Sequence, residues 1–161
     1  MPQASANTTE APHQGTITLA TSRFGEMIVD ADKIITMTTP LLGFPEAKHF
    51  VLKPHGEKSP FLWLQSVEDQ HLAFVVIPAT FLLPEYQPSV PESVRGELAA
   101  AGEERLEILL ILTIPAGNPQ KMTANLLGPL VVNSSKRLAR QVLQDMAAYD
   151  SCWPVFVEET E

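Results

Sequence analysis

The side chains able to do chemistry are spread along this sequence without a catalytic or metal-binding spacing. The four histidines, His13, His49, His55 and His71, and the single cysteine, Cys152, do not follow the Cys and His spacing of a zinc site. The sequence carries no phosphate-binding glycine loop and no nucleophile elbow. A Cys–His nucleophile pair stays open, because its members need not be close in sequence. These patterns favour a binding protein over an enzyme, and they predict no cofactor or metal.

Composition places the chain among acidic globular proteins. Of its 161 residues, 45% are hydrophobic and 19% are charged, which suits one folded domain with its own core. The net charge of −8 argues against direct nucleic-acid binding, which requires cationic surface to neutralise phosphate. The same charge suits a basic protein partner, although a charge that only maintains solubility also explains it.

Targeting and membrane signals are missing from the sequence. The apolar runs have the length of strands, far below the roughly 18–20 residues of a membrane span. Met1 to Gly15 is polar and lacks the cationic start and apolar core of a secretory signal. The lone Cys152 fits a reducing compartment. We therefore expect a cytoplasmic protein that does not contact the membrane.

Short apolar runs between proline-containing turns predict a mainly β, single-domain fold with one or two short helices. Ile108 to Ile114 is a continuous apolar run typical of a strand buried on both faces, although a short buried helix also fits it. Leu130 to Val132 predicts another strand, and Pro91 to Ala100 is the best helix candidate. The expected boundaries are 1–15 for a disordered tail, 16–157 for the β domain and 158–161 for an acidic tail.

Three short strands are expected to open the domain as an antiparallel meander. They cover Ile17–Ala20, Phe24–Val29 and Lys33–Met37, which are rich in β-branched residues. The turn between the last two holds Asp30 and Asp32. These two carboxylates could bind calcium or magnesium, but no further oxygen ligands follow at the spacing of a metal-binding loop. The other interpretation is that they are ordinary acidic turn residues.

The middle of the chain adds further expected elements. Trp63 is predicted to pack in the core, on a strand that pairs with Ala73–Pro78. Phe81–Pro88 is predicted as an edge strand whose prolines limit pairing. Leu41–Lys48 is predicted as a tight, buried turn with one helical turn, and the alternating pattern of Arg137–Leu143 favours a strand, with a helix as the alternative.

Several ordered segments resemble the FliW family of flagellar assembly factors. The matching segments are GFPEAKHFVL, PFLWLQSVEDQHLAFVV, ILTIP, KMTANLLGPLVVN and RLARQV. The resemblance covers residues 17–157. The positions of its motifs that are expected to have structural roles are Gly43, Phe44, Trp63, Gln65, Thr123, Asn125, Pro129 and Asn133. Asn125 lies between apolar neighbours, so it is predicted to be buried in the core, with an exposed partner contact as the alternative. The chain departs from the family at Gly128, where Ala is usual and where glycine is expected to add backbone freedom, and at Ser151–Pro154.

The resemblance implies a small, barrel-like, non-enzymatic protein, here an antiparallel β-barrel. It also implies two partners, flagellin and the RNA-binding translational repressor CsrA. In the family, FliW that is free of flagellin binds CsrA and relieves its repression of flagellin translation. The alternative is a flagellin-binding chaperone or scaffold with no part in translation.

Acidic flanks and an apolar segment are the candidate partner-binding residues. The acidic candidates lie where strands begin or end, and a basic partner would meet them there, although solvated flanks are the simpler interpretation. The apolar candidates would form a shallow groove for an amphipathic helix, and core packing is their alternative role. The candidates are Glu68, Asp69, Glu103, Glu104, Glu107, Phe156, Phe81, Leu82, Leu83 and Tyr86.

Overall fold

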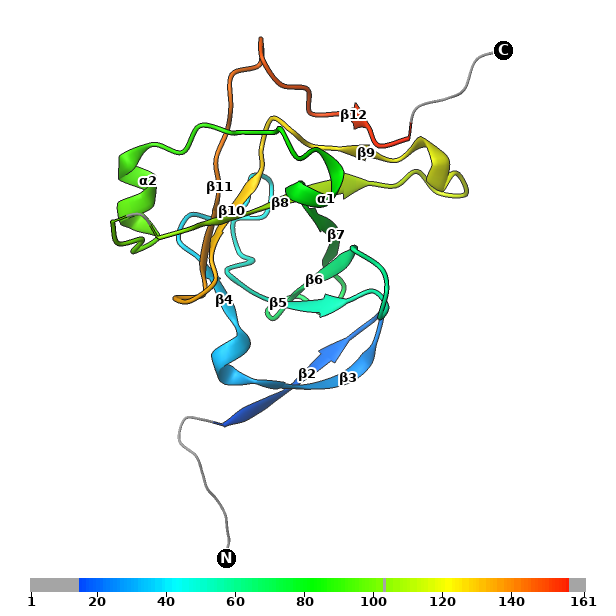
Figure 1. Ribbon diagram of the computed structural model, residues 1–161. Coiled ribbons are helices and arrows are strands. Elements are labelled where there is room, and N and C mark those ends of the chain that lie inside the picture. The colour runs from blue at the N-terminus through cyan, green and yellow to red at the C-terminus, as the bar shows by residue number, and fades with distance from the viewer. Residues whose placement is uncertain (1–14, 103, 157–161) are drawn as a thin grey trace, which may run out of the picture.

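Seven strands close into a barrel in the computed structural model, which describes residues 15–102 and 104–156 (Figure 1). In spatial order these strands are β10 (Leu130–Asn133), β11 (Leu138–Gln141), β4 (Ile35–Met37), β5 (His49–Pro54), β6 (Leu62–Ser66), β7 (Ala73–Pro78) and β8 (Glu107–Thr113). The pairing of β10 with β8 closes the ring. All neighbours are antiparallel except β11 and β4, which are parallel. The predicted mainly β, barrel-like fold is confirmed, with this one parallel pair.

Alternation along the strands fills the barrel with apolar side chains. Successive residues of a strand point to opposite faces, so every second side chain enters the interior. Phe50 and Val76 are fully buried there, and Leu64, Leu109 and Leu130 belong to the same cluster. This interior cluster has the most buried residues of the three apolar clusters among the described residues.

Helices and loops cover the outer face of the strand predicted at Ile108–Ile114. Leu110 and Leu112 point outward from β8 and pack beneath α1 (Ala79–Leu82) and the segment that follows it. On the next strand, Val131 packs under α2 (Glu92–Glu97). The predicted burial of this strand on both faces is therefore confirmed, and α2 lies inside the predicted helix. The sheet continues beyond β8 through β9 (Thr123–Ala124), which follows the short turn η3 (Pro119–Lys121), and then β12 (Trp153–Pro154).

The first two strands form a separate hairpin on the outside of the barrel. β2 (Thr16–Thr21) pairs with β3 (Gly25–Asp30), and the backbone N–H of Ser22 donates to the carbonyl of Gln70, 2.9 Å away, in the β6–β7 turn. The predicted antiparallel pairing of the first two strands of the meander is confirmed, but its third strand is wrong, because β4 pairs with β5 and β11 and not with β3. The short turn η2 (Ala31–Lys33) separates β3 from β4, whose apolar residues enter the barrel interior.

Two local predictions are wrong because turns replace the expected structure. Phe81–Pro88 is not an edge strand: the chain enters α1 after Pro78 and then turns, with the N–H of Tyr86 bonded to the carbonyl of Leu83. After Gly43, a single turn closed by the N–H of Ala47 and the carbonyl of Phe44, 3.2 Å apart, replaces the expected helical turn. The N–H of Phe44 bonds to the carbonyl of Leu41, which makes a tight turn.

Two burial predictions also need correction. Trp63 is only half-buried on the outer face of β6, where the guanidinium carbon of Arg23 lies 4.2 Å from its ring centre. Asn125 is half-buried as well, because the loop that carries it runs over the barrel and not through it.

The predicted tails at 1–15 and 158–161 fall outside the described residues, apart from Gly15. The Gly15 carbonyl accepts a hydrogen bond from the N–H of Ala31. In the parts of the chain that are described, no helix has the length and apolar character needed to cross a bilayer.

Candidate partner-binding groove

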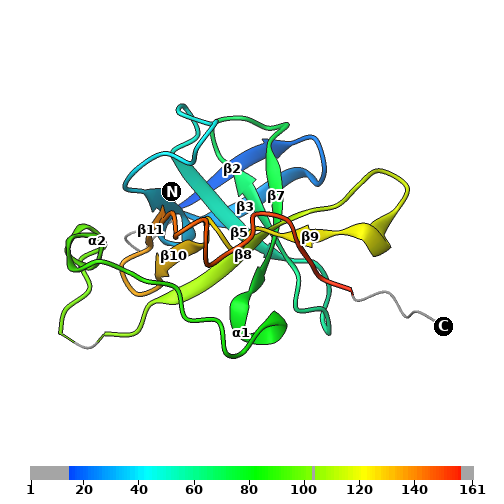
Figure 2. The same ribbon diagram turned by 90° about the horizontal axis from the view of Figure 1, so that it is seen from above.

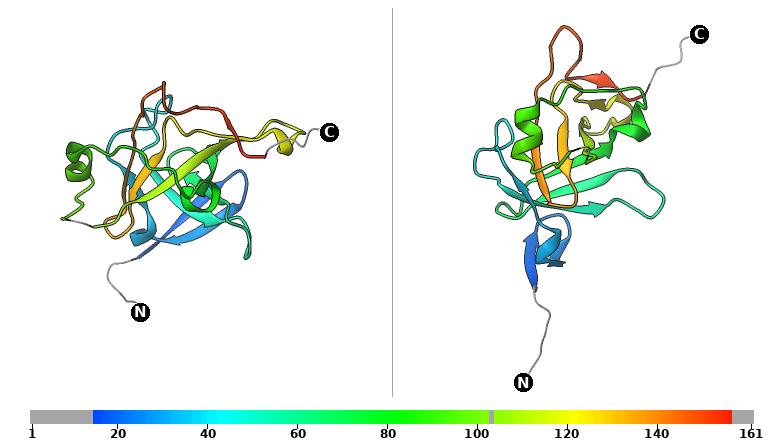
Figure 3. Two further views of the ribbon diagram at one scale, coloured as in Figure 1. Left: turned by 45° about the horizontal axis from the view of Figure 1, so that its top comes forward. Right: turned by 60° about the vertical axis from the view of Figure 1, so that its left-hand side comes forward.

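A groove of about 580 Å³ lies on the outer surface of the barrel where three segments meet. One wall is the segment from Pro78 to Tyr86, which contains α1. The facing wall is the approach to β8 from Glu104 to Leu109, and the end is the β10–β11 turn at Asn133–Ser135. Figure 3 shows α1 lying against β7 and β8. The groove brings together four of the predicted partner-binding residues, Leu83, Tyr86, Glu104 and Glu107, from two segments about twenty residues apart.

The apolar wall is held in place by Tyr86. Its ring is buried and packs edge-on against Tyr149, with 5.0 Å between ring centres. Its hydroxyl donates a hydrogen bond to the carbonyl of Leu126, 2.5 Å away. Burial, with a smaller contribution from Tyr149, raises the pKa of Tyr86 above its ordinary value. Tyr86 is therefore a neutral anchor for this wall, and the half-buried Leu83 offers the apolar contact.

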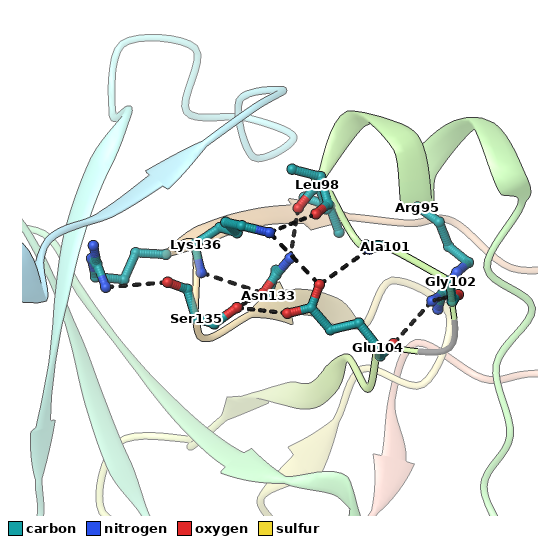
Figure 4. Close-up of polar contacts among 10 residues, drawn as sticks. Arg95, Leu98, Ala101, Gly102, Glu104, Asn133, Ser135 and Lys136 are labelled. Atoms are coloured by element: carbon teal, nitrogen blue, oxygen red, sulfur yellow. Dashed lines mark hydrogen bonds and ion pairs between the residues drawn. The ribbon is translucent and has the colours of Figure 1, made fainter.

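The acidic wall is held by hydrogen bonds to the Glu104 carboxylate (Figure 4). One oxygen lies 2.6 Å from the Ser135 hydroxyl, and the other accepts the backbone N–H of Ala101 at 3.1 Å. The Lys136 ammonium lies 3.8 Å away. The hydrogen bonds from Ser135 and Ala101, followed by the charge of Lys136, hold the pKa of Glu104 below its usual value. Glu104 is thus ionised and oriented at neutral pH.

Asn133 connects the end of the groove to α2. Its side chain is buried, and its amide nitrogen donates to the carbonyl of Leu98 at 2.8 Å. Its amide oxygen lies 3.0 Å from the Ser135 hydroxyl and accepts the backbone N–H of Lys136 at 3.3 Å. These bonds satisfy both ends of a buried amide. These hydrogen bonds fix the β10–β11 turn, which carries Ser135 and Lys136, the partners of the Glu104 carboxylate.

Glu107 offers a carboxylate that the protein itself leaves available. It is exposed at the first position of β8, opposite Val132 in the register of β10. Within residues 15–102 and 104–156 its side chain has no hydrogen bond or ion pair. It is the clearest candidate for a direct charge contact with a partner.

Glu68 and Asp69 line a second, smaller hollow of about 370 Å³, together with Phe44. Glu68 accepts the backbone N–H groups of Lys48 and His49, at 3.1 and 3.0 Å, and pairs with the His49 ring. Partial burial raises its pKa, but the hydrogen bonds from His49 and Lys48 outweigh this and hold the pKa below its usual value. Glu68 therefore fastens the start of β5 to the β6–β7 turn.

The remaining predicted contact residues lie apart from the groove. Phe81 is 69% exposed and does not line it, although it belongs to α1. Phe156 is 50% exposed, just after β12. Leu82 is half-buried and packs on the outer core cluster. Glu103 lies outside the described residues.

The motif residues mostly shape turns. Gly43 has a φ of +89°, a conformation that glycine adopts without strain. The fully buried Gln65 donates from its amide nitrogen to the carbonyls of Ser66 and Leu72, at 3.0 and 3.1 Å, across the β6–β7 turn. Asn125 accepts the N–H of Gly128 at 2.9 Å. Of the remaining motif residues, Phe44 packs edge-on against Phe74, Pro129 is buried and its carbonyl accepts the N–H of Val142, and Thr123 pairs with Thr113 and Pro154.

Gly128 leaves space for the end of the Gln141 side chain and does not supply backbone freedom. Its φ is not in the left-handed region, so that expectation is wrong. A Cβ placed there would lie 2.7 Å from the amide nitrogen of Gln141, which donates to the Gly128 carbonyl at 3.0 Å. The glycine thus allows Gln141 to approach the central loop.

Sequence analysis missed Ser135 and Lys136, which orient Glu104. They lie about thirty residues from it, so only the pairing of β10 with β8 makes them neighbours. Among the described residues, no group of three or more His, Cys, Asp or Glu side chains is arranged to hold a metal ion. The groove itself has an apolar wall facing a wall with two carboxylates, Glu104 and Glu107, and one cation, Arg105.

Comparison with known proteins identifies the family. The model of the FliW protein family matches residues 18–155. A flagellar assembly factor FliW from Magnetococcus marinus is 41% identical over 122 residues, which are 76% of this chain and 75% of that protein. One from Leptospira interrogans is 39% identical over 130 residues, 79% of this chain and 85% of that protein.

The fold agrees with the sequence comparison. A crystal structure of the flagellar assembly factor FliW matches with a TM-score of 0.81 at 30% identity, and the match covers 89% of this chain and 100% of that one. The family predicted from the ordered motifs is therefore confirmed, and the chain belongs to the FliW family.

Proposed function

We propose that this protein is a flagellar assembly factor that binds flagellin and the translational repressor CsrA in the cytoplasm. Binding of CsrA would relieve its repression of flagellin translation, and flagellin would compete for the same protein. The relatives from Magnetococcus marinus and Leptospira interrogans carry the name flagellar assembly factor. The two partners are those that the FliW resemblance implies.

The groove supports this proposal best. Leu83 gives it an apolar wall, while Glu104 and Glu107 give it two negative charges against the one positive charge of Arg105. An amphipathic segment with cationic side chains at its edge would match both walls. CsrA must expose cationic surface to bind RNA phosphates, so an acidic groove would attract it electrostatically. The protein would act by binding, and no catalytic step is required of it.

A competition titration tests the proposal. We would follow binding of purified protein to CsrA of the same organism by calorimetry, first alone and then with flagellin at saturating concentration. We expect CsrA to bind, and flagellin to weaken the apparent affinity. By linkage, CsrA should weaken flagellin binding by the same factor.

The alternative function gives a different result. A flagellin-binding chaperone or scaffold would bind flagellin and show no heat with CsrA at any ratio. That outcome would remove the translational role and keep the assembly role. Failure to bind either partner would contradict both.

A further inference from the structure

Cationic and aromatic side chains interleave on a surface formed by the β2–β3 hairpin and the β5–β6 strands. The Arg23 guanidinium stacks over the Trp63 ring at 4.2 Å, and the Lys53 ammonium lies 5.2 Å from the centre of the Phe24 ring. Phe24 meets Trp63 edge-on at 5.7 Å. The residues of this cation–aromatic surface are Arg23, Phe24, Lys53, His55, Phe61 and Trp63.

The stacking orients the two cations without consuming their hydrogen-bond donors. Neither Arg23 nor Lys53 forms a hydrogen bond or an ion pair with any described residue. Stacked on a ring face, a guanidinium still has N–H groups at its edge that can bind a carboxylate in bidentate fashion. Glu26 and Glu57 are acidic residues close to Arg23 and Lys53 in sequence, and neither pairs with them.

Cations near the groove are used differently. Arg140 pairs with Glu97 at 2.5 Å, and Lys136 lies 3.8 Å from Glu104. Arg95 donates to the carbonyls of Gly102 and Glu104, both at 2.9 Å. These three charges are compensated within the protein, whereas Arg23 and Lys53 present theirs outward from a protein with a net charge of −8. Arg105, which also lines the groove, has no such partner among the described residues, but it is not stacked on a ring.

The cation–aromatic surface is also separate from the groove. Figures 1 and 2 both place the β2–β3 hairpin on a different side of the barrel from α2 and the start of β8. None of its six residues lines the groove.

From this geometry we infer that the cation–aromatic surface is a second interaction site, and that its partner is an acidic polypeptide segment whose carboxylates pair with Arg23 and Lys53. A single-stranded nucleic acid fits less well. It requires open aromatic faces for base stacking, whereas Arg23 covers Trp63 and Lys53 covers Phe24. The inference goes beyond the proposed function, because it does not depend on CsrA or on the groove.

Trp63 provides the measurement. The protein has two tryptophans, so in a Trp153→Phe background the emission reports Trp63 alone. We would titrate this protein with a hexaglutamate peptide and, separately, with a six-nucleotide oligouridine. We expect a saturable change of emission with hexaglutamate that weakens as salt is added. A response only to oligouridine, or to neither probe, would overturn the inference.

Charge reversal with a matched control completes the test. Arg23→Glu with Lys53→Glu should weaken hexaglutamate binding about tenfold or more, since each exposed pair is replaced by repulsion. Lys33→Glu with Lys48→Glu changes the net charge equally at exposed positions outside the surface and should leave binding nearly unchanged. Equal losses in both double variants would show that only net charge matters, and would contradict the site.

Because the same stacking also fastens the hairpin to the barrel, a milder variant separates binding from folding. Arg23→Gln with Lys53→Gln removes the charges while keeping side chains of similar length. Thermal unfolding should then change little while hexaglutamate binding is lost. Retained hexaglutamate binding in this variant would contradict the site.

Discussion

The groove and the cation–aromatic surface hold opposite charges by opposite means. In the groove, Glu104 is fixed by a hydroxyl, a backbone N–H and a nearby ammonium, which together orient it and offset part of its charge. On the cation–aromatic surface, Arg23 and Lys53 are positioned by ring faces, which leave their donors unused. Hydrogen bonds thus fix the Glu104 carboxylate in one orientation, whereas stacking leaves the charges of Arg23 and Lys53 available to a partner. In the groove, Glu107 and Arg105 resemble the second case, since both are exposed and neither has a side-chain hydrogen bond or ion pair within the described residues.

The largest expected effect concerns the buried amide that supports the groove. Asn133→Ala removes the donor to the Leu98 carbonyl and leaves that acceptor and the Lys136 N–H without their partner. We expect a loss of about 2–3 kcal/mol in the free energy of unfolding, measured with urea. The matched control, Asn118→Ala in an exposed turn, should change it by less than about 0.5 kcal/mol. Similar losses in both variants would mean that Asn133 does not support the groove.

Reversal of the unpaired groove charge should affect binding and not folding. Glu107→Lys places a cation where a basic partner is expected, so we predict an affinity for CsrA lower by about tenfold or more in calorimetry. Stability should be unchanged within about 0.5 kcal/mol, because the side chain is exposed. Glu57→Lys, an equal charge change in the β5–β6 loop, is the control. Unchanged affinity for Glu107→Lys would exclude this wall as the CsrA contact.

Removal of all three acidic side chains before β8 tests whether Glu104, which is held by hydrogen bonds, adds to the binding contribution of Glu107. Alanine at Glu103, Glu104 and Glu107 together should weaken CsrA binding further than Glu107→Ala alone. Since Glu104 also holds the β10–β11 turn, some stability should be lost too, and urea unfolding measures that part. If the triple variant bound as tightly as the single one, Glu104 would have no role in binding.

A smaller effect should appear in acid. The folded state lowers the pKa of Glu104, so its contribution to stability is fully present above the unfolded value near 4.5 and is lost as the pH falls through the folded pKa. Glu104→Gln should therefore reduce stability at pH 7, and the difference from the parent should shrink below pH 4.5. Thermal unfolding across this range measures it. A difference that does not change with pH would show that the charge is not involved.

The smallest expected effect belongs to the other surface. Arg23→Ala removes one stacking contact of roughly 0.5–1 kcal/mol. We expect faster amide hydrogen exchange in the β2–β3 hairpin and unchanged exchange in the barrel strands. Lys33→Ala, which makes no such contact, is the control. Equal protection of the hairpin in both variants would mean that the stack does not hold it.

The sequence determined the local elements and the family. Apolar runs located β7, β8 and β10, because a strand buried on both faces must be apolar throughout. The alternation at Arg137–Leu143 located β11. The ordered motifs identified the FliW family, because they occur together and in one order. The acidic composition suits a basic partner, or solubility alone, and does not locate a binding surface.

Only the tertiary structure decided which residues share a surface. Glu104 meets Ser135 because β8 pairs with β10. Trp63 lies outside the core because its neighbour Leu64 faces the barrel interior, and Arg23 of the hairpin covers the Trp63 ring. The β4–β11 pair was missed, and β3 was wrongly expected to pair with β4, for a related reason. Strand pairing depends on which edges remain free once the barrel closes, and a local pattern does not encode that choice.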